Sequence, residues 1–141
     1  MYIIIVGCGR IGSMLATDLS NEGNDVVIID QDRLKLDDLG SGFNGLRSVG
    51  VEYDNDVLQE AGIQKADVFY AMTPNDNVNL VASQIAKKVY GVNRVISRVN
   101  DPTKQFLYDQ LGLESICPSS LTVIMSKAMI EPHKKQDKVA M

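Results

Sequence analysis

The stretch IIIVGCGRIG, residues 3–12, decides the fold of this chain. It joins a continuous apolar run, 2–7, to a helix-like pattern that begins at Arg10. Such a run is typical of a parallel strand that is buried on both faces. A G-x-G-x-x-G loop between a strand and a helix brings backbone amides close to a phosphate. The stretch therefore predicts a strand–loop–helix unit that binds a nucleotide.

Strand-like and helix-like segments alternate six times along the rest of the chain. The expected strands are 2–7, 25–30, 46–51, 67–72, 94–99 and 114–118. The expected helices are 10–22, 32–39, 56–63, 75–91, 102–112 and 119–130, with Pro102 at the first position of the fifth and Ser119 capping the last. Alternation with short connections predicts an α/β fold, a Rossmann-type doubly wound sheet of six parallel strands.

Composition and charge narrow the class of protein. The 141 residues suit one domain, and 14 Lys and Arg against 18 Asp and Glu give a net charge of −4. This balance argues against non-specific nucleic-acid binding, which needs a basic surface. No apolar run reaches the roughly 18 to 20 residues of a membrane helix, and the first residues lack the basic start of a signal peptide. We expect a cytoplasmic protein without direct membrane insertion.

The glycines and the acid at the end of the second strand have separate expected roles. Gly7 allows a tight turn, Gly9 lets the backbone approach phosphates, and Gly12 permits close packing of helix on strand; the alternative is that all three only turn the chain. Asp30 can accept hydrogen bonds from both ribose hydroxyls and would repel a 2′-phosphate. NAD or an adenine nucleotide is therefore favoured over NADP. Arg33, three residues later, either weakens the preference for a ligand without a 2′-phosphate or is a solvated helix residue.

Polar residues at three further places in the sequence are candidates for ligand contact, and most have a structural alternative. Arg10 would pair with a terminal phosphate or with an acid of a partner subunit, unless it is simply exposed at a helix start. In TPNDNVN, residues 73–79, Thr73 and Asn75 fall at the carboxyl edge of the sheet, where ligands bind in open α/β sheets. Asn75 or Asp76 could instead cap the next helix. Arg98 lies in an apolar strand and needs a partner, either Asp76 or a ligand.

Catalytic groups are scarce. The only histidine is His133, in the polar tail, and no tyrosine is followed four residues later by a lysine. Cys8 and Cys117 are too few for a disulfide framework or a structural zinc site, and we expect both to be small buried hydrophobic residues. A non-enzyme is therefore expected. The alternatives are an NAD-dependent oxidoreductase module without its substrate domain, and a nucleotide-binding domain with some other partner.

Four segments taken in order resemble one known family. They are 3–32 (IIIVGCGRIGSMLATDLSNEGNDVVIIDQD), 57–88 (VLQEAGIQKADVFYAMTPNDNVNLVASQIAKK), 95–102 (VISRVNDP) and 111–120 (LGLESICPSS). Together they resemble the TrkA N-terminal, or RCK/KTN, nucleotide-binding domain of potassium channel and transporter regulators. The resemblance covers residues 1 to about 130, and the ordered set is far more specific than the glycine loop alone.

The resemblance implies a regulatory, gating function. It implies a Rossmann domain that forms homodimers, with eight copies often arranged as a ring beneath a potassium transporter or channel, at the inner face of the membrane. NAD(H), ATP, ADP or AMP would occupy the glycine loop and shift the shape of the ring. The implied division is a nucleotide-binding domain at 1–118, a crossover and dimerisation helix at 119–131, and a polar tail at 132–141. The apolar residues of 119–130 cover most of the helix circumference, which independently indicates a partner.

Carried over to this chain, the resemblance gives a set of nucleotide-contacting residues. Arg10 would hold a terminal phosphate, Asp30 the ribose, and Arg98 would lie near the phosphates or a dimer contact. The full set is Gly7, Cys8, Gly9, Arg10, Ile11, Gly12, Asp30, Gln31, Arg33, Glu52, Tyr53, Thr73, Pro74, Asn75 and Arg98.

Two departures from the family pattern stand out. The usual Gly-Asp after the third strand is Gly50-Val51 here, so either Glu52 or Asp54 substitutes or the contact is lost. Many relatives also continue into a second, C-terminal ligand-binding domain, which makes this chain either a truncated or a minimal form.

Overall fold

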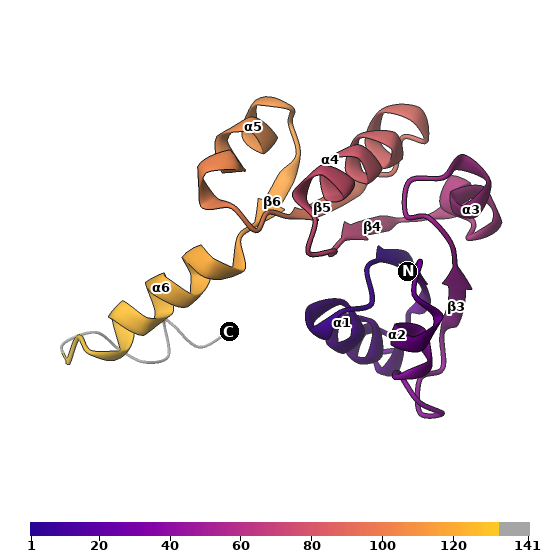
Figure 1. Ribbon diagram of the computed structural model, residues 1–141, viewed down its shortest axis with the longest axis horizontal. Helices are drawn as coiled ribbons and strands as arrows, with labels where there is room; N and C mark the ends of the chain where they lie inside the picture. The colour runs from indigo at the N-terminus through magenta and orange to yellow at the C-terminus, as the bar shows by residue number, and fades with distance from the viewer. Residues whose placement is uncertain (133–141) are drawn as a thin grey trace.

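The expected sheet is confirmed in a computed structural model that describes residues 1–132; His133 and nearly all of the expected tail lie outside that part. Six parallel strands lie in the order β3-β2-β1-β4-β5-β6 (Figure 1). Their bounds are Tyr2–Val6 (β1), Asp25–Asp30 (β2), Leu46–Val49 (β3), Val68–Ala71 (β4), Arg94–Arg98 (β5) and Glu114–Ile116 (β6). The order reverses direction at β1 and β4, as it does in doubly wound nucleotide-binding sheets.

The helices follow the strands as expected, with differences at their ends. They are Arg10–Asn21 (α1), Arg33–Asp37 (α2), Asn55–Glu60 (α3), Asp76–Gln84 (α4), Gln105–Gln110 (α5) and Pro118–Met129 (α6). The expected helix 75–91 continues beyond α4 as a π-helix, Ile85–Val89. The expectation that Ser119 caps the last helix was wrong: Pro118 takes the first helical position and Cys117 the cap, because proline needs no amide partner there.

Two apolar layers hold the sheet between its helices. Alternate residues of a strand point to opposite faces, so Ile4 packs toward α3, α4 and α5, and Ile3 packs toward α1 and α2. Both residues are buried, which is why the run 2–7 is apolar without alternation. The largest buried side chains on the first face include Tyr108, Phe69 and Leu58.

Among residues 1–132, no helix covers one part of the sheet. On the α1 side, a hollow of about 430 Å³ lies over β4, β5 and β6, and it is almost wholly apolar. Its lining comprises Ile11, Leu15, Tyr70, Met72, Ile96, Arg98, Ile116, Pro118 and Leu121. Helix α6 leaves the body beside this hollow (Figure 1), and none of its residues is buried. The hollow and the apolar residues of α6 form a continuous surface, which we call the open face.

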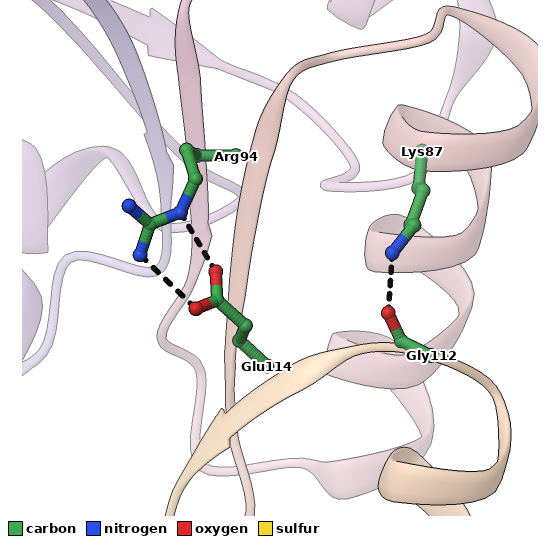
Figure 2. Close-up of polar contacts among 4 residues, drawn as sticks. All are labelled: Lys87, Arg94, Gly112 and Glu114. Atoms are coloured by element: carbon green, nitrogen blue, oxygen red, sulfur yellow. Dashed lines mark hydrogen bonds and ion pairs between the residues drawn. The ribbon is translucent and has the colours of Figure 1, made fainter.

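Polar contacts on both faces of the sheet fix the edge strand β6. The Arg94 guanidinium binds both oxygens of the Glu114 carboxylate, at 2.8 and 3.1 Å (Figure 2). Lys87, in the π-helix, donates to the carbonyl of Gly112 in the turn before β6 (Figure 2). The ion pair lies on the same face as Ile96 and Ile116 and ties β6 to β5, whereas Lys87 ties the turn before β6 to the end of α4.

The sheet core predicts a sharp difference between two truncations. Phe69→Ala removes a fully buried ring from β4 and should lower the free energy of unfolding by about 3–5 kcal/mol. Leu34→Ala, at an exposed position of α2, should change it by less than about 0.5 kcal/mol. Urea denaturation followed by circular dichroism checks both, and equal losses would contradict this account of the core.

Candidate nucleotide-binding site

The glycine loop makes two contacts that leave no room for a side chain. Gly7 has φ +100°, and a Cβ there would lie 2.8 Å from the backbone nitrogen of Thr73. A Cβ on Gly12 would lie 1.8 Å from the carbonyl oxygen of Gly7. Gly7 therefore turns tightly against the end of β4, and Gly12 lets α1 start directly on the loop. The turning and packing expected of these two glycines is what the geometry requires.

Gly9 differs from the other two glycines of the loop. Its φ is −80°, and a Cβ built there would meet nothing within 4 Å. Nothing within the described chain thus requires a glycine at this position. Gly9 caps α1 without any side-chain hydrogen bond, and the first turn of α1 contains no acidic residue. The free backbone amides and the positive end of the helix dipole suit a phosphate group, which a side chain at Gly9 would obstruct.

Asp30 fastens this loop to the end of β2. Its side chain is 7% exposed, one oxygen accepts from the Cys8 amide at 2.8 Å, and the other accepts from the Asp32 amide at 2.8 Å. A carboxylate oxygen has two acceptor sites, so each retains one for a ribose hydroxyl. The negative charge remains beside the loop, where a 2′-phosphate would meet repulsion. Asp30 can thus shape the loop and bind ribose together.

The two candidate substitutes for the acid that Val51 replaces, Glu52 and Asp54, have different surroundings. Asp54 caps α3, accepting hydrogen bonds from the Asp56 and Val57 amides, so its carboxylate already has local partners. Glu52 is instead buried, and it accepts from the Gln31 side chain at 2.8 Å. Gln31 directly follows Asp30, which places the Glu52 carboxylate at the ribose end of the glycine loop. Tyr53, the next residue, is exposed.

Thr73 forms the wall opposite this acidic end. The backbone amide and hydroxyl of Thr73 both donate to Oδ1 of Asn79, at 2.9 and 2.7 Å. Pro74 and Asn75 follow on the exposed side of the turn. Asn75 caps α4, because its side-chain oxygen accepts from the amides of Asn77 and Val78. Asn75 therefore caps helix α4, which was the alternative to a ligand-binding role. Only its side-chain nitrogen remains available to a ligand.

Arg98 does not have the partner that the sequence suggested. Its Nε donates to the Asn100 side chain at 2.7 Å, while Asp76 accepts from the Asn100 side-chain amide at 2.9 Å. Asp76 also accepts from the Asp101 backbone amide, at 3.0 Å. The expected Arg98–Asp76 ion pair is thus replaced by a contact through Asn100, while the Asp76 carboxylate accepts three hydrogen bonds from the loop after β5. Arg98 lines the open face rather than the glycine loop.

The two remaining arginines of the predicted site are exposed. Arg10 is the first residue of α1, and its guanidinium makes no hydrogen bond or ion pair with residues 1–132. It shares a surface hollow with Gly9 and Lys35, on the outer side of the loop. Arg33 begins α2 and is solvated. Arg10 is therefore free to move toward an anion held by the loop.

The cysteine in the loop is a packing residue. Cys8 is 4% exposed, and its thiol lies 3.3 Å from the carbonyl of Lys35. Burial, aided by the Asp30 carboxylate, raises the pKa of this thiol to about 11. The thiol is thus protonated at neutral pH and a poor nucleophile. Cys117 is also buried, as expected for both cysteines.

The structure brings most of the expected residues to one edge of the sheet. The ends of β1, β2 and β4 are in register, with Val6 opposite Ile29 and Ala71. Arg98 and Ile11 lie toward the open face. Sequence reasoning did not place Asn79 or Asn100 in the site. The signal for Asn79 was available: it lies on one helical face with Ala82, Ser83 and Ala86, and an amide on a buried face needs partners.

Comparison with known proteins points to a single family. The model of the TrkA-N domain matches residues 3–118. The Trk system potassium uptake protein TrkA of Streptomyces coelicolor is 41% identical over 116 residues, which are 82% of this chain and 52% of that protein. A TrkA homolog of the same system from Pyrococcus abyssi is 38% identical over 111 residues, 79% of this chain and 49% of that protein. The chain thus spans about half the length of these curated relatives.

Solved structures of low sequence identity share the fold. The TrkA-N domain of the inner membrane protein ybaL from Escherichia coli has a TM-score of 0.83 at 18% identity, with 92% of this chain and 96% of that chain covered. GsuK bound to ADP has a TM-score of 0.76 at 20% identity, covering 94% of this chain and 34% of that one. The GsuK channel bound to NAD has a TM-score of 0.72 at 21% identity, covering 90% and 22%.

No helix in residues 1–132 combines the length and apolar character needed to cross a membrane.

Two alanine substitutions in the same loop should destabilise the fold to very different extents. Gly12→Ala places a Cβ into the Gly7 carbonyl and should lower the free energy of unfolding by about 3 kcal/mol or more. Gly9→Ala meets no atom and should cost less than about 1 kcal/mol, since it only weakens a helix cap. Urea denaturation of the two variants checks this, and a larger loss for Gly9→Ala would contradict the assigned geometry.

Proposed function

The chain belongs to the TrkA-N domain family, and on that premise we propose that it is a cytosolic regulatory domain of a potassium uptake system. In this proposal it binds NAD(H) or an adenine nucleotide and couples the bound state to the arrangement of its subunits. The names of the relatives support a role in potassium uptake. The ADP and NAD bound to GsuK support the proposed class of ligand. The membrane partner would be a potassium transporter or channel subunit.

One observation carries the nucleotide part of the proposal. In the loop between β1 and α1, Gly7 and Gly12 are required by internal packing, whereas Gly9 borders open space at the start of α1. Asp30 holds the same loop and keeps acceptor sites free beside it. Phosphates would bind the amides around Gly9, and the ribose would bind Asp30. Glu52 would add a second carboxylate at the ribose end, which strengthens the preference for a ligand without a 2′-phosphate.

Arg10 would distinguish ligands by their phosphate tails. It starts α1 beside Gly9 and has no partner in residues 1–132, so its guanidinium can pair with a phosphate beyond those that the loop amides hold. A triphosphate reaches further than a monophosphate from the same ribose site. We therefore assign to Arg10 the difference in affinity between ATP and AMP.

The open face provides the means of coupling to other subunits. Exposed apolar residues cover α6, including Leu121, Val123, Ile124 and Met129, and the hollow beside them is apolar. We propose that a second copy covers this surface, with α6 as the crossover helix of a homodimer, within a larger ring in the full assembly. A nucleotide would shift the arrangement only by binding one arrangement more tightly than another.

We further propose that the domain binds its nucleotide without catalysing a reaction. The thiol in the loop is protonated at neutral pH, and its pKa of about 11 leaves it without nucleophilic character. The polar groups at the sheet edge, such as Asn75 and Asp76, are engaged in capping and loop contacts. These residues hold backbone in place, which suits a domain that senses a ligand.

The decisive experiment identifies the ligand and the assembly in one sample. Mass spectrometry of the purified protein should find a co-purifying NAD(H) or adenine nucleotide, and light scattering should give the mass of at least a dimer. A nucleotide-free monomer that fails to bind ATP, ADP and NAD in calorimetry would overturn the proposal.

Arg10→Ala should weaken ATP binding selectively. We expect the Kd for ATP to rise about tenfold, equivalent to about 1.4 kcal/mol, while the Kd for AMP changes less than twofold. Arg33→Ala removes the same charge from exposed α2 and serves as the matched control, with both affinities unchanged. Isothermal titration calorimetry measures all four values, and equal losses for ATP and AMP would refute the terminal-phosphate role.

Ile124→Glu should break the proposed dimer. It places a carboxylate among the exposed apolar residues of α6, and we expect sedimentation equilibrium to show monomers. Ser126→Glu adds the same group to the same helix at a polar position, about 200° around the axis, and should leave the association state unchanged. Identical association of both variants and the unaltered chain would exclude α6 from the interface.

A further inference from the structure

One buried side chain connects two parts of the proposed nucleotide site without lying in it. Asn79, on α4, is 0% exposed. Its Oδ1 accepts from the amide and the hydroxyl of Thr73, at 2.9 and 2.7 Å. Its Nδ2 donates to the carbonyls of Thr73 and Arg98, at 2.8 and 3.0 Å. Both acceptor sites and both donors of the carboxamide are used, and three of the four bonds go to one residue.

The residue held in this way is the surface against which the glycine loop turns. A Cβ on Gly7 would lie 2.8 Å from the Thr73 nitrogen, so the two backbone segments are in direct contact. The Gly7 amide is held on its other side by the Ile29 carbonyl, at 2.8 Å. A shift of Thr73 toward the loop would displace Gly7, and with it the amides that follow in the loop. Close-packed backbone transmits such shifts because it has no free volume to absorb them.

The fourth hydrogen bond of Asn79, to the Arg98 carbonyl, also holds the end of strand β5. By holding the Arg98 carbonyl, Asn79 joins the ends of β4 and β5 below the loop 73–75. Thr73 accepts a further hydrogen bond from the Asn100 side chain, at 3.3 Å, and Asn100 binds Arg98. Thr73 is therefore fixed from α4 and from the loop after β5 together.

We propose that Asn79 is a positioning residue of the nucleotide site: it sets nucleotide affinity through the placement of Thr73 and the glycine loop. This rests on the proposed function for the existence of the ligand. Asn79 does not touch the nucleotide, and its contribution depends on the donor and acceptor pattern of a carboxamide rather than on its volume. The role goes beyond helix packing, which Leu or Met at this position would serve equally well.

Asn79→Asp tests this pattern at nearly constant volume. The carboxylate keeps the acceptor for Thr73 but turns an oxygen toward the carbonyls of Thr73 and Arg98, which repel it. We expect the Kd for ADP, measured by calorimetry well below the melting temperature, to rise at least about tenfold. Val95→Ala, which opens a cavity at the opposite end of β5, is the control: it should lower the melting temperature yet leave the Kd within about twofold. An unchanged Kd in Asn79→Asp would overturn the proposal.

A second measurement does not depend on any ligand. Amide hydrogen exchange at Gly7 and Cys8 should become faster in Asn79→Asp than in Val95→Ala at matched stability, because only the former releases Thr73 from behind the loop. Equal exchange rates would refute the positioning role. If the unaltered chain binds no adenine nucleotide, the proposed function fails, and hydrogen exchange still decides the role of Asn79. Should Asn79→Asp not fold, Asn79→Ser, which can reach only part of the four partners, replaces it in both measurements.

Discussion

The contact between Gly12 and the carbonyl of Gly7 is the constraint on which the rest of the structure depends. A Cβ would lie 1.8 Å from that oxygen, so α1 can start on the loop only because residue 12 has none. This brings the first turn of α1 directly over the end of β1 and fixes where its free amides point. Asp30 then reaches the Cys8 amide from β2, and Thr73 meets Gly7 from β4. The edge of the sheet where a nucleotide would bind thus depends on the absence of a side chain at Gly12.

Much of this arrangement could be predicted from the sequence, because it rests on local patterns. Continuous apolar runs mark strands that are covered on both faces, and β1 is the clearest case. Regular alternation with helices then reduces the possible parallel topologies to a handful. Gly7, Gly12 and Asp30 could be given roles for the same reason: their conformations and contacts follow from their places at the ends of strands.

The predictions that failed concern contacts between segments far apart in the chain. Arg98 is separated from Asp76 by 22 residues, and the sequence could not show that Asn100 would stand between them. Asn79 is similar in one respect, since one of its four hydrogen bonds reaches the Arg98 carbonyl on β5, 19 residues away. The π-helix after α4 and the cap of α6 depend on how a helix end fits its surroundings. Periodicity predicts that a helix exists far better than it predicts how the helix ends.

The open face has a thermodynamic consequence for the fold itself. Rossmann sheets are ordinarily covered on both sides, yet here apolar residues of β4, β5 and β6 line a hollow in the single chain. Whatever covers that surface binds the folded state and not the unfolded one, so it raises the free energy of unfolding by mass action. If a second copy covers it, as proposed, the melting temperature of this chain would rise with its concentration. In the proposed dimer, folding and assembly would be linked equilibria, joined through the part of the sheet that helices α1 to α6 leave uncovered.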